Sequence, residues 1–199
     1  IAINRIYVER AIYEEYLEKF AFAVKKLSIG DGARETVDLG PMCTKTGLEK
    51  IMRHAEDARR KGARILTGGK APSGEKYEHG TFYEPTVIAD ATQDMLVMRE
   101  ESFGPVVGVA PFDSLDEALV LANNSPYGLA GICFTSNLNT AQKVCRLLDA
   151  GNIAINNVDA GVMNAPYGGM KESGFGYEHG PEGLFEYLTA KHLRFKYGE

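Results

Sequence analysis

Residues 100–105 (EESFGP) combine side chains that can take part in catalysis or in ligand binding. They place two carboxylates and one aromatic ring on a Gly-Pro turn, directly before the apolar run 106–112. Carboxylates act as general acids or bases and accept hydrogen bonds, and an aromatic face can pack a flat ring. Acidic residues are also common before strands, and Phe103 could belong to the core, so spacing alone leaves both a structural and a functional role open.

The glycine-rich segment 168–176 (GGMKESGFG) has the composition of a phosphate-binding loop without its spacing. A Walker loop needs Gly-Lys-Ser/Thr at the start of a helix, whereas here a glutamate follows the lysine. A dinucleotide loop needs G-x-G-x-x-G after a strand, and Gly174, Gly176 and Gly180 miss the last spacing by one residue. We therefore predict a tight structural loop.

Cysteine and histidine spacing predicts no metal site. Cys43, Cys133 and Cys145 form no C-x-x-C pair, and the four histidines show no ligand pair at helical spacing. Cys133 lies in an apolar run and Cys145 on the apolar stripe of a predicted helix, so we expect core residues rather than nucleophiles. The odd count argues against a disulfide framework and favours a reducing, cytoplasmic environment.

Alternating strands and helices must position these segments. Strand patterns fall at 6–8, 63–66, 83–88, 106–112, 130–135, 152–156 and 187–197. Helical patterns fall at 10–27, from 46 onward, at 115–123, at 138–148 and after Pro181. The alternation predicts βαβ units, and hence one compact α/β domain with a mostly parallel sheet.

Two details of these helices are specific predictions. Residues 46–49 (TGLE) and 114–117 (SLDE) fit capping boxes, so we expect helices to begin there. The helix over 10–27 is expected to bury a stripe of five residues: Ile12, Tyr16, Phe20, Val24 and Leu27.

Composition narrows the class of protein. The 199 residues include 44% hydrophobic and 25% charged residues, which is typical of a globular chain of about one domain. The net charge is −5 and no dense basic stripe is present, which argues against a nucleic-acid partner. No apolar run approaches the roughly 20 residues of a membrane span, so we expect no membrane association.

Five motifs, in order along the chain, resemble the aldehyde dehydrogenase superfamily. Residues 101–106 (ESFGPV) are similar to its E-x-F-G-P-V segment. The other four stretches are 80–87 (GTFYEPTV), 122–130 (ANNSPYGLA), 151–156 (GNIAIN) and 166–174 (PYGGMKESG). The resemblance covers essentially the whole chain. It implies a three-layer α/β sandwich with a mostly parallel sheet and a C-terminal strand for oligomerisation.

Residues 1–8 (IAINRIYV) resemble the stretch after the catalytic cysteine in the family's G-Q-x-C-x-A-x-x-R pattern, with Ala2 and Arg5 in register. That cysteine would immediately precede Ile1, and the general base, oxyanion asparagine and dinucleotide-binding domain would also lie upstream. The resemblance therefore implies a C-terminal catalytic-domain fragment, inactive alone and without a catalytic residue of its own. The parent would be an NAD(P)-dependent oxidoreductase that oxidises an aldehyde to a carboxylic acid through a cysteine thioester.

Two residues match family positions that bind the cofactor, NAD or NADP. Glu101 matches the glutamate that hydrogen-bonds the nicotinamide-ribose hydroxyls, and Phe103 matches the aromatic residue beside the nicotinamide.

Four residues match the loop that lines the aldehyde pocket: Asn156, Asp159, Gly161 and Tyr167. Gly161 stands where several members carry an aromatic residue, which implies a wider or more polar pocket. The run 166–176 is similar to that of semialdehyde-oxidising members.

The implied organisation is a catalytic domain at 1–186 and a tail at 187–199. The tail would self-associate through residues 188–195 in a homo-oligomer, and the other partner would be a small-molecule aldehyde. Two alternatives stay open: a coenzyme-A-acylating or phosphate-reducing member of the superfamily, and a non-catalytic α/β oligomerisation module. The identity of the aldehyde and the choice between NAD and NADP also stay open.

Overall fold

The computed structural model describes residues 3–159 and 161–198, and the chain divides into two compact units, Ile1–Ala118 and Leu119–Glu199. The division falls within α4 (Leu115–Asn123), a continuous helix that begins as predicted. Because no loop separates the two units, linker-like composition could not mark the division in the sequence.

The first unit contains a four-stranded sheet in the order β1-β4-β3-β2. Its strands are β1 (Arg5–Glu9), β2 (Arg64–Thr67), β3 (Thr86–Ala89) and β4 (Val106–Phe112). The central strand β4 pairs in parallel with β1 and β3, and β2 pairs antiparallel with β3 at one edge. This mixed, mostly parallel sheet confirms the predicted α/β class.

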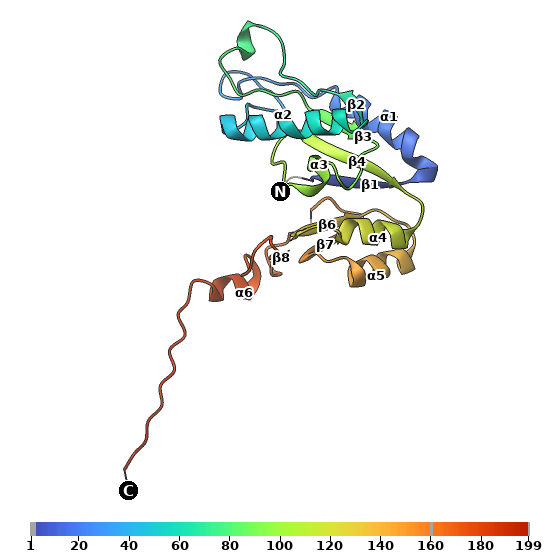
Figure 1. Cartoon of the computed structure of the whole chain (residues 1–199). Helices are drawn as coiled ribbons and strands as arrows, with labels where there is room; N and C mark the ends of the chain where they lie inside the picture. Colours follow the sequence, from blue (N-terminus) through green and yellow to red (C-terminus); the bar gives the residue numbers. More distant parts are fainter. Residues whose placement is uncertain (1–2, 160, 199) are drawn as a thin grey trace. The chain divides into compact units, whose positions relative to one another are not determined.

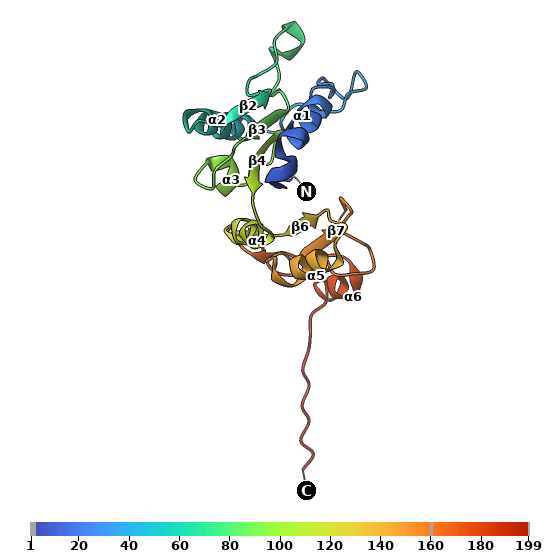
Figure 2. The same cartoon turned by 90° about the vertical axis from the view of Figure 1, so that its right-hand side faces the viewer.

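Helices cover both faces of this sheet. The helical elements of the unit are η1 (Arg10–Ile12), α1 (Tyr13–Val24), α2 (Lys45–Arg60), η2 (Glu75–Tyr77) and α3 (Leu96–Arg99). Figure 2 shows α1 and α2 on opposite sides of the strands. On β4, Val106 and Ala110 join the core on the α2 side, whereas Val109 joins the core on the α1 side. This alternation follows from the two-residue period of a strand.

The buried face of α1 differs from the predicted stripe. Tyr13, Leu17 and Ala21 are buried, whereas Ile12 is 53% and Leu27 40% exposed. The three other predicted residues pack only partly against the core: Tyr16, Phe20 and Val24. The prediction was wrong at both ends because the α-helix spans only Tyr13–Val24, so Ile12 and Leu27 lie outside it.

Helix α2 begins two residues earlier than the capping box predicts. Thr44 is the N-cap, with extended backbone angles, and its Oγ1 accepts a hydrogen bond from the amide of Gly47 at 3.0 Å. Thr46 already lies inside the helix. Two threonines two positions apart offered alternative caps, and the extended backbone at Thr44 decided between them.

The second unit contains two small sheets. Strands β6 (Ala130–Cys133) and β7 (Asn152–Ile155) pair in parallel, and β5 (Tyr127–Gly128) pairs antiparallel with β8 (Met170–Lys171). It also contains α5 (Leu138–Leu147), α6 (Gly180–Phe185) and the second half of α4. Pro181 lies in the first turn of α6, as predicted.

The cysteines correct one expectation about the core. Val144 is the buried residue of α5, whereas Cys145 is exposed, so its prediction as a core residue was wrong. The helical stripe is turned by one residue from the predicted one. Cys133 is partly buried, and burial raises the pKa of its thiol. All three cysteines are free.

The predicted strand over 187–197 is not formed. Figure 1 shows this tail running out beyond α6, and the described residues 188–198 hold neither helix nor strand. A strand needs a neighbour to satisfy its backbone groups, and the described part of the chain supplies none to the tail. Its large side chains are exposed, including Tyr187, Phe195 and Tyr197.

Across residues 3–159 and 161–198, no helix has the length and apolar character needed to cross a membrane.

Candidate functional site

Residues 100–105 connect α3 to β4 in the first unit and turn successive side chains in opposite directions. Ser102 is 1% exposed, whereas Phe103 is 64% exposed. Glu101 is also exposed. The inward serine therefore anchors a loop that presents a carboxylate and an aromatic ring outward.

The backbone of this loop is held in an unfavourable conformation. Phe103 has φ +51°, a left-handed value that bulky residues rarely adopt and that costs about 1–3 kcal/mol. The next residue, Gly104, packs tightly on α2, because a Cβ there would lie 2.9 Å from Cγ2 of Ile51. The surrounding structure must hold the loop against this strain.

A buried histidine lies beneath the loop. His54 of α2 is fully buried, with Nδ1 3.1 Å from Oγ of Ser102 and Nε2 3.0 Å from a carboxylate oxygen of Glu100. Arg53 donates a second hydrogen bond to that carboxylate at 2.8 Å. The amide of Asn4 reaches the backbone carbonyl of Glu100 at 3.4 Å.

These contacts favour an ionised Glu100 and a neutral His54. The hydrogen bond from His54 and the charge of Arg53 hold the pKa of Glu100 below its ordinary value, against an opposing effect of burial. Burial lowers the pKa of His54, although its bond to Glu100 partly opposes this shift. The neutral imidazole therefore donates from Nε2 to the carboxylate and accepts from the Ser102 hydroxyl at Nδ1, because a carboxylate can only accept.

Sequence reasoning missed His54, although one signal was present. His54 lies three residues after Ile51 and four before Ala58, so it falls on the buried stripe of the helix. A polar side chain on such a stripe needs a partner.

Asn156 begins the predicted pocket loop of the second unit. It has φ +55°, and its side-chain amide closes a two-way bridge to the backbone of Thr135. Its Oδ1 accepts from the Thr135 amide and its Nδ2 donates to the Thr135 carbonyl, both at 2.8 Å. This amide shapes the loop where β7 ends.

Three other predicted pocket residues lie together. Oδ1 of Asp159 accepts from the Gly161 amide at 2.9 Å, and a Cβ at Gly161 would lie 3.5 Å from the Tyr167 ring. Burial, together with the charges of Asp159 and Glu178, raises the pKa of Tyr167. Its hydroxyl oxygen is buried without a hydrogen-bond partner among the described residues.

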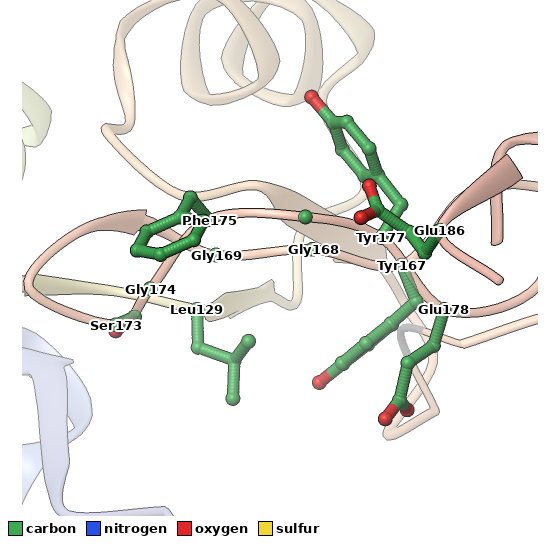
Figure 3. A pocket seen from close by; sticks show the side chains of 11 residues that line it. Leu129, Tyr167, Gly168, Gly169, Ser173, Gly174, Phe175, Tyr177, Glu178 and Glu186 are labelled. Carbon is green, nitrogen blue, oxygen red and sulfur yellow. The ribbon is translucent and has the colours of Figure 1, made fainter. Parts of the chain in front are cut away.

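Tyr167 also lines an open hollow of about 400 Å³ in the glycine-rich segment (Figure 3). The segment folds back on itself, because Tyr167 and Glu178 exchange backbone hydrogen bonds at 2.7 and 2.8 Å. The approach is close, since a Cβ at Gly169 would lie 2.8 Å from that of Ser173. The segment is the tight loop that its spacing predicts.

The candidate residues fall into two groups. Glu101 and Phe103 share one loop of the first unit, and the four predicted pocket residues belong to the second unit. In the described parts of both units, no group of three or more His, Cys, Asp or Glu side chains could hold a metal ion.

Comparison with known proteins decides the family. A sequence model of the aldehyde dehydrogenase family matches residues 1–193. The chain belongs to the aldehyde dehydrogenase family. It is 41% identical over 193 residues to succinate-semialdehyde dehydrogenase [NADP(+)] 2 of Schizosaccharomyces pombe, covering 97% of this chain and 38% of that protein. It is 36% identical to the betaine aldehyde dehydrogenase of Bacillus subtilis, covering 96% of this chain and 39% of that protein.

Solved aldehyde dehydrogenase structures share the fold. The betaine aldehyde dehydrogenase of Staphylococcus aureus in complex with NAD+ matches with a TM-score of 0.89 and 39% identity, covering 96% of this chain and 38% of that one. A 3,6-anhydro-L-galactose dehydrogenase in complex with NAP matches with a TM-score of 0.89 and 36% identity, covering 94% of this chain and 39% of that one. The chain thus spans about two fifths of the length of these relatives.

Proposed function

We propose that this chain is the C-terminal part of the catalytic domain of an NAD(P)-dependent aldehyde dehydrogenase. The parent protein would oxidise an aldehyde to a carboxylic acid through a cysteine thioester. Family membership over residues 1–193 supports the reaction class, and the 38% coverage of the Schizosaccharomyces pombe relative supports a partial chain. The observation that carries the proposal is the strained, anchored loop that presents Glu101 and Phe103.

This loop fits a nicotinamide dinucleotide. The exposed Glu101 carboxylate accepts hydrogen bonds, as the two hydroxyls of a ribose require, and the exposed Phe103 ring offers a flat apolar face. When bound, the dinucleotide supplies the hydride acceptor. The role of this chain is to orient the dinucleotide, so that its nicotinamide ring, which accepts the hydride, is held in one position.

The chemistry of the remaining steps is assigned to groups outside this chain. A cysteine thiolate would attack the aldehyde carbon, loss of hydride would give a thioester, and an activated water would release the acid and the thiol. This chain alone would therefore be inactive.

The pocket loop of the second unit would contact the aldehyde. Asp159, Gly161 and Tyr167 lie together, and the small Gly161 leaves room beside the tyrosine ring. Asn156 would fix the start of this loop through its two hydrogen bonds to the backbone of Thr135. Succinate-semialdehyde dehydrogenases are among the relatives, which supports a semialdehyde as the first substrate to test.

The proposal extends to organisation and partners. A catalytic domain would span 1–186, and the tail at 187–199, which carries several exposed large hydrophobic side chains, would pair with another subunit of a homo-oligomer. The exposed side chains of Leu188, Leu193 and Phe195 support this, because they have no cover within the described chain. The location would be cytoplasmic, which the three free thiols support.

The test is an assay of the whole protein that contains this chain, with NAD+ and NADP+ against succinate semialdehyde, betaine aldehyde and simple aliphatic aldehydes. NAD(P)H should form without coenzyme A or phosphate. A strict need for coenzyme A or phosphate would favour the alternative reactions of the superfamily. Robust turnover by the isolated 199-residue chain would overturn the assignment of the chemistry to upstream groups.

A Glu101→Gln substitution tests the cofactor contact. It removes one charged acceptor, so the KM for the dinucleotide should rise about tenfold, since a hydrogen bond to a charged group contributes roughly 1.5–3 kcal/mol. The matched control is Glu49→Gln, which makes the same change at an exposed position on α2. Equal KM values in the two variants would exclude Glu101 from the dinucleotide site.

A further inference from the structure

We propose that His54 is a positioning residue that holds Glu101 and Phe103 in the geometry needed to bind the dinucleotide. This inference rests on the proposed function of the loop. His54 itself touches neither the cofactor nor the reacting atoms; it acts through the loop that lies on it.

The first argument is the placement of its two bonds. Nε2 of His54 reaches the side chain of Glu100 at 3.0 Å, and Nδ1 reaches the side chain of Ser102 at 3.1 Å. The two partners are the residues immediately before and after Glu101. One imidazole ring therefore fixes both sides of the residue expected to contact the ribose.

The second argument is the free-energy cost of burying the polar ring of His54. His54 is fully buried, and burying a polar ring in place of an apolar one disfavours folding unless its nitrogens are satisfied. Its helix neighbours on the same face are apolar, among them Ile51, Ala55 and Ala58. Packing alone would be served by another apolar residue, whereas the polar ring supplies the loop with a donor and an acceptor.

The third argument is the strain that must be opposed. Phe103, with φ +51°, directly follows Ser102, which is 1% exposed and bonded to His54. A strained residue keeps its conformation only where its surroundings determine it. Without the bond to Ser102, the Phe103 backbone is free to relax and the ring to move.

The test compares His54→Ala with variants that retain one bond each. Asn places an amide atom near the position of Nδ1, and Gln places one near the position of Nε2, so His54→Asn can keep the Ser102 bond and His54→Gln the Glu100 bond. In the whole protein, His54→Ala should raise the KM for the dinucleotide about tenfold, while kcat and the KM for the aldehyde change less than about threefold. The Asn and Gln variants should fall between wild type and Ala.

Tyr13→Phe is the matched control for stability. Tyr13 is also buried, its hydroxyl donates to the Val109 carbonyl at 3.1 Å and accepts from the Asp90 amide at 2.7 Å, and it lies in the core on the other face of the sheet. Removing the Tyr13 hydroxyl should destabilise the first unit without a selective effect on the KM for the dinucleotide. Equal KM shifts in His54→Ala and Tyr13→Phe would overturn the inference.

Hydrogen exchange separates this inference from the function on which it rests. In His54→Ala the amides of residues 101–104 should exchange about tenfold faster, with β4 unchanged. If the Ala variant does not fold, Ser102→Ala removes one of the two bonds and should raise both exchange and KM to a smaller extent. Unchanged exchange in the loop would overturn the positioning role. If exchange rises but wild type reduces neither NAD+ nor NADP+ with any aldehyde, the proposed function fails, and with it the role in cofactor binding.

Discussion

Residues 100–105 of the first unit are held by side-chain to side-chain hydrogen bonds from a helix 46 positions earlier in the sequence, whereas residues 156–159 and 161–178 of the second unit are held mainly by hydrogen bonds in which at least one partner is a backbone group. In the first loop, His54 joins two loop side chains. In the second, Asp159 bonds the amide two residues on, and Tyr167 pairs with Glu178 through the backbone.

This difference predicts that the two loops are destabilised by different kinds of substitution. A loop anchored by a side chain fails when that side chain or its partner is removed. A loop anchored by close backbone approach fails when a Cβ is added, because backbone atoms cannot move aside as a flexible side chain can. Substitutions of both kinds therefore distinguish the two loops.

The largest effect is expected for Gly151→Ala in the second unit. A Cβ at this position would lie 2.0 Å from the Gly168 carbonyl oxygen, which also accepts from the Asn152 side chain at 2.9 Å. The added methyl must displace that backbone, so we expect a loss of about 3 kcal/mol in the free energy of unfolding. Urea denaturation measures it.

Gly161→Ala is the control for this clash, since its Cβ would make only ordinary contacts, the nearest at 3.5 Å from the Tyr167 ring. It should change stability by less than about 1 kcal/mol. A similar loss in both variants would show that close backbone approach does not hold the loop.

Ser102→Ala should have the next largest effect. It leaves the buried Nδ1 of His54 without its partner, so we expect a loss of about 1–2 kcal/mol in the free energy of unfolding. Denaturant midpoints of the variant and wild type give the value. Ser114→Ala removes a serine hydroxyl from the more exposed bond to the Glu117 amide, and its loss should be the smaller of the two.

Asn156→Gly should cost less than Ser102→Ala, about 0.5–1 kcal/mol, although it removes two hydrogen bonds. Glycine is the test residue because φ is +55° at this position, which would strain an alanine. The side chain is exposed, so water replaces both bonds to Thr135. A loss of unfolding free energy greater than that of Ser102→Ala, measured in the same urea titration, would contradict the proposed difference between the two loops.

Acidification should give the mildest effect, confined to the first unit. The pKa of His54 lies below its ordinary value because of burial, so the unfolded chain binds the proton more readily than the folded one. Stability present above the unfolded pKa of about 6.5 should therefore fall as the pH drops below it. Glu100, Arg53 and Lys50 are the charged groups that act on this titration.

Urea midpoints measured at several pH values between about 7.5 and 5 test this slope. His54→Gln removes the titrating ring and should flatten it. An unchanged slope in that variant would assign the pH dependence to other groups.

Local patterns predicted the elements of the fold well. The strand at 106–112 and the helix at 115–123 match β4 and α4 to the residue, because a continuous apolar run and a Ser-x-x-Glu cap are each complete within a few positions. Patterns with two equivalent solutions gave errors of one or two residues. The cap of α2 is Thr44 rather than Thr46, and the buried residue of α5 is Val144 rather than Cys145.

The sequence by itself determined the α/β class, the family through its ordered motifs, and the candidate residues Glu101 and Phe103. The tertiary structure decided how the loop that carries them is held. His54 and Ser102 are 48 positions apart, and no spacing rule joins a histidine on one helix to a serine before a distant strand. Only the packing of α2 against the sheet brings them to hydrogen-bond distance. Because both side chains are buried away from water, each must find its hydrogen-bond partner in the protein.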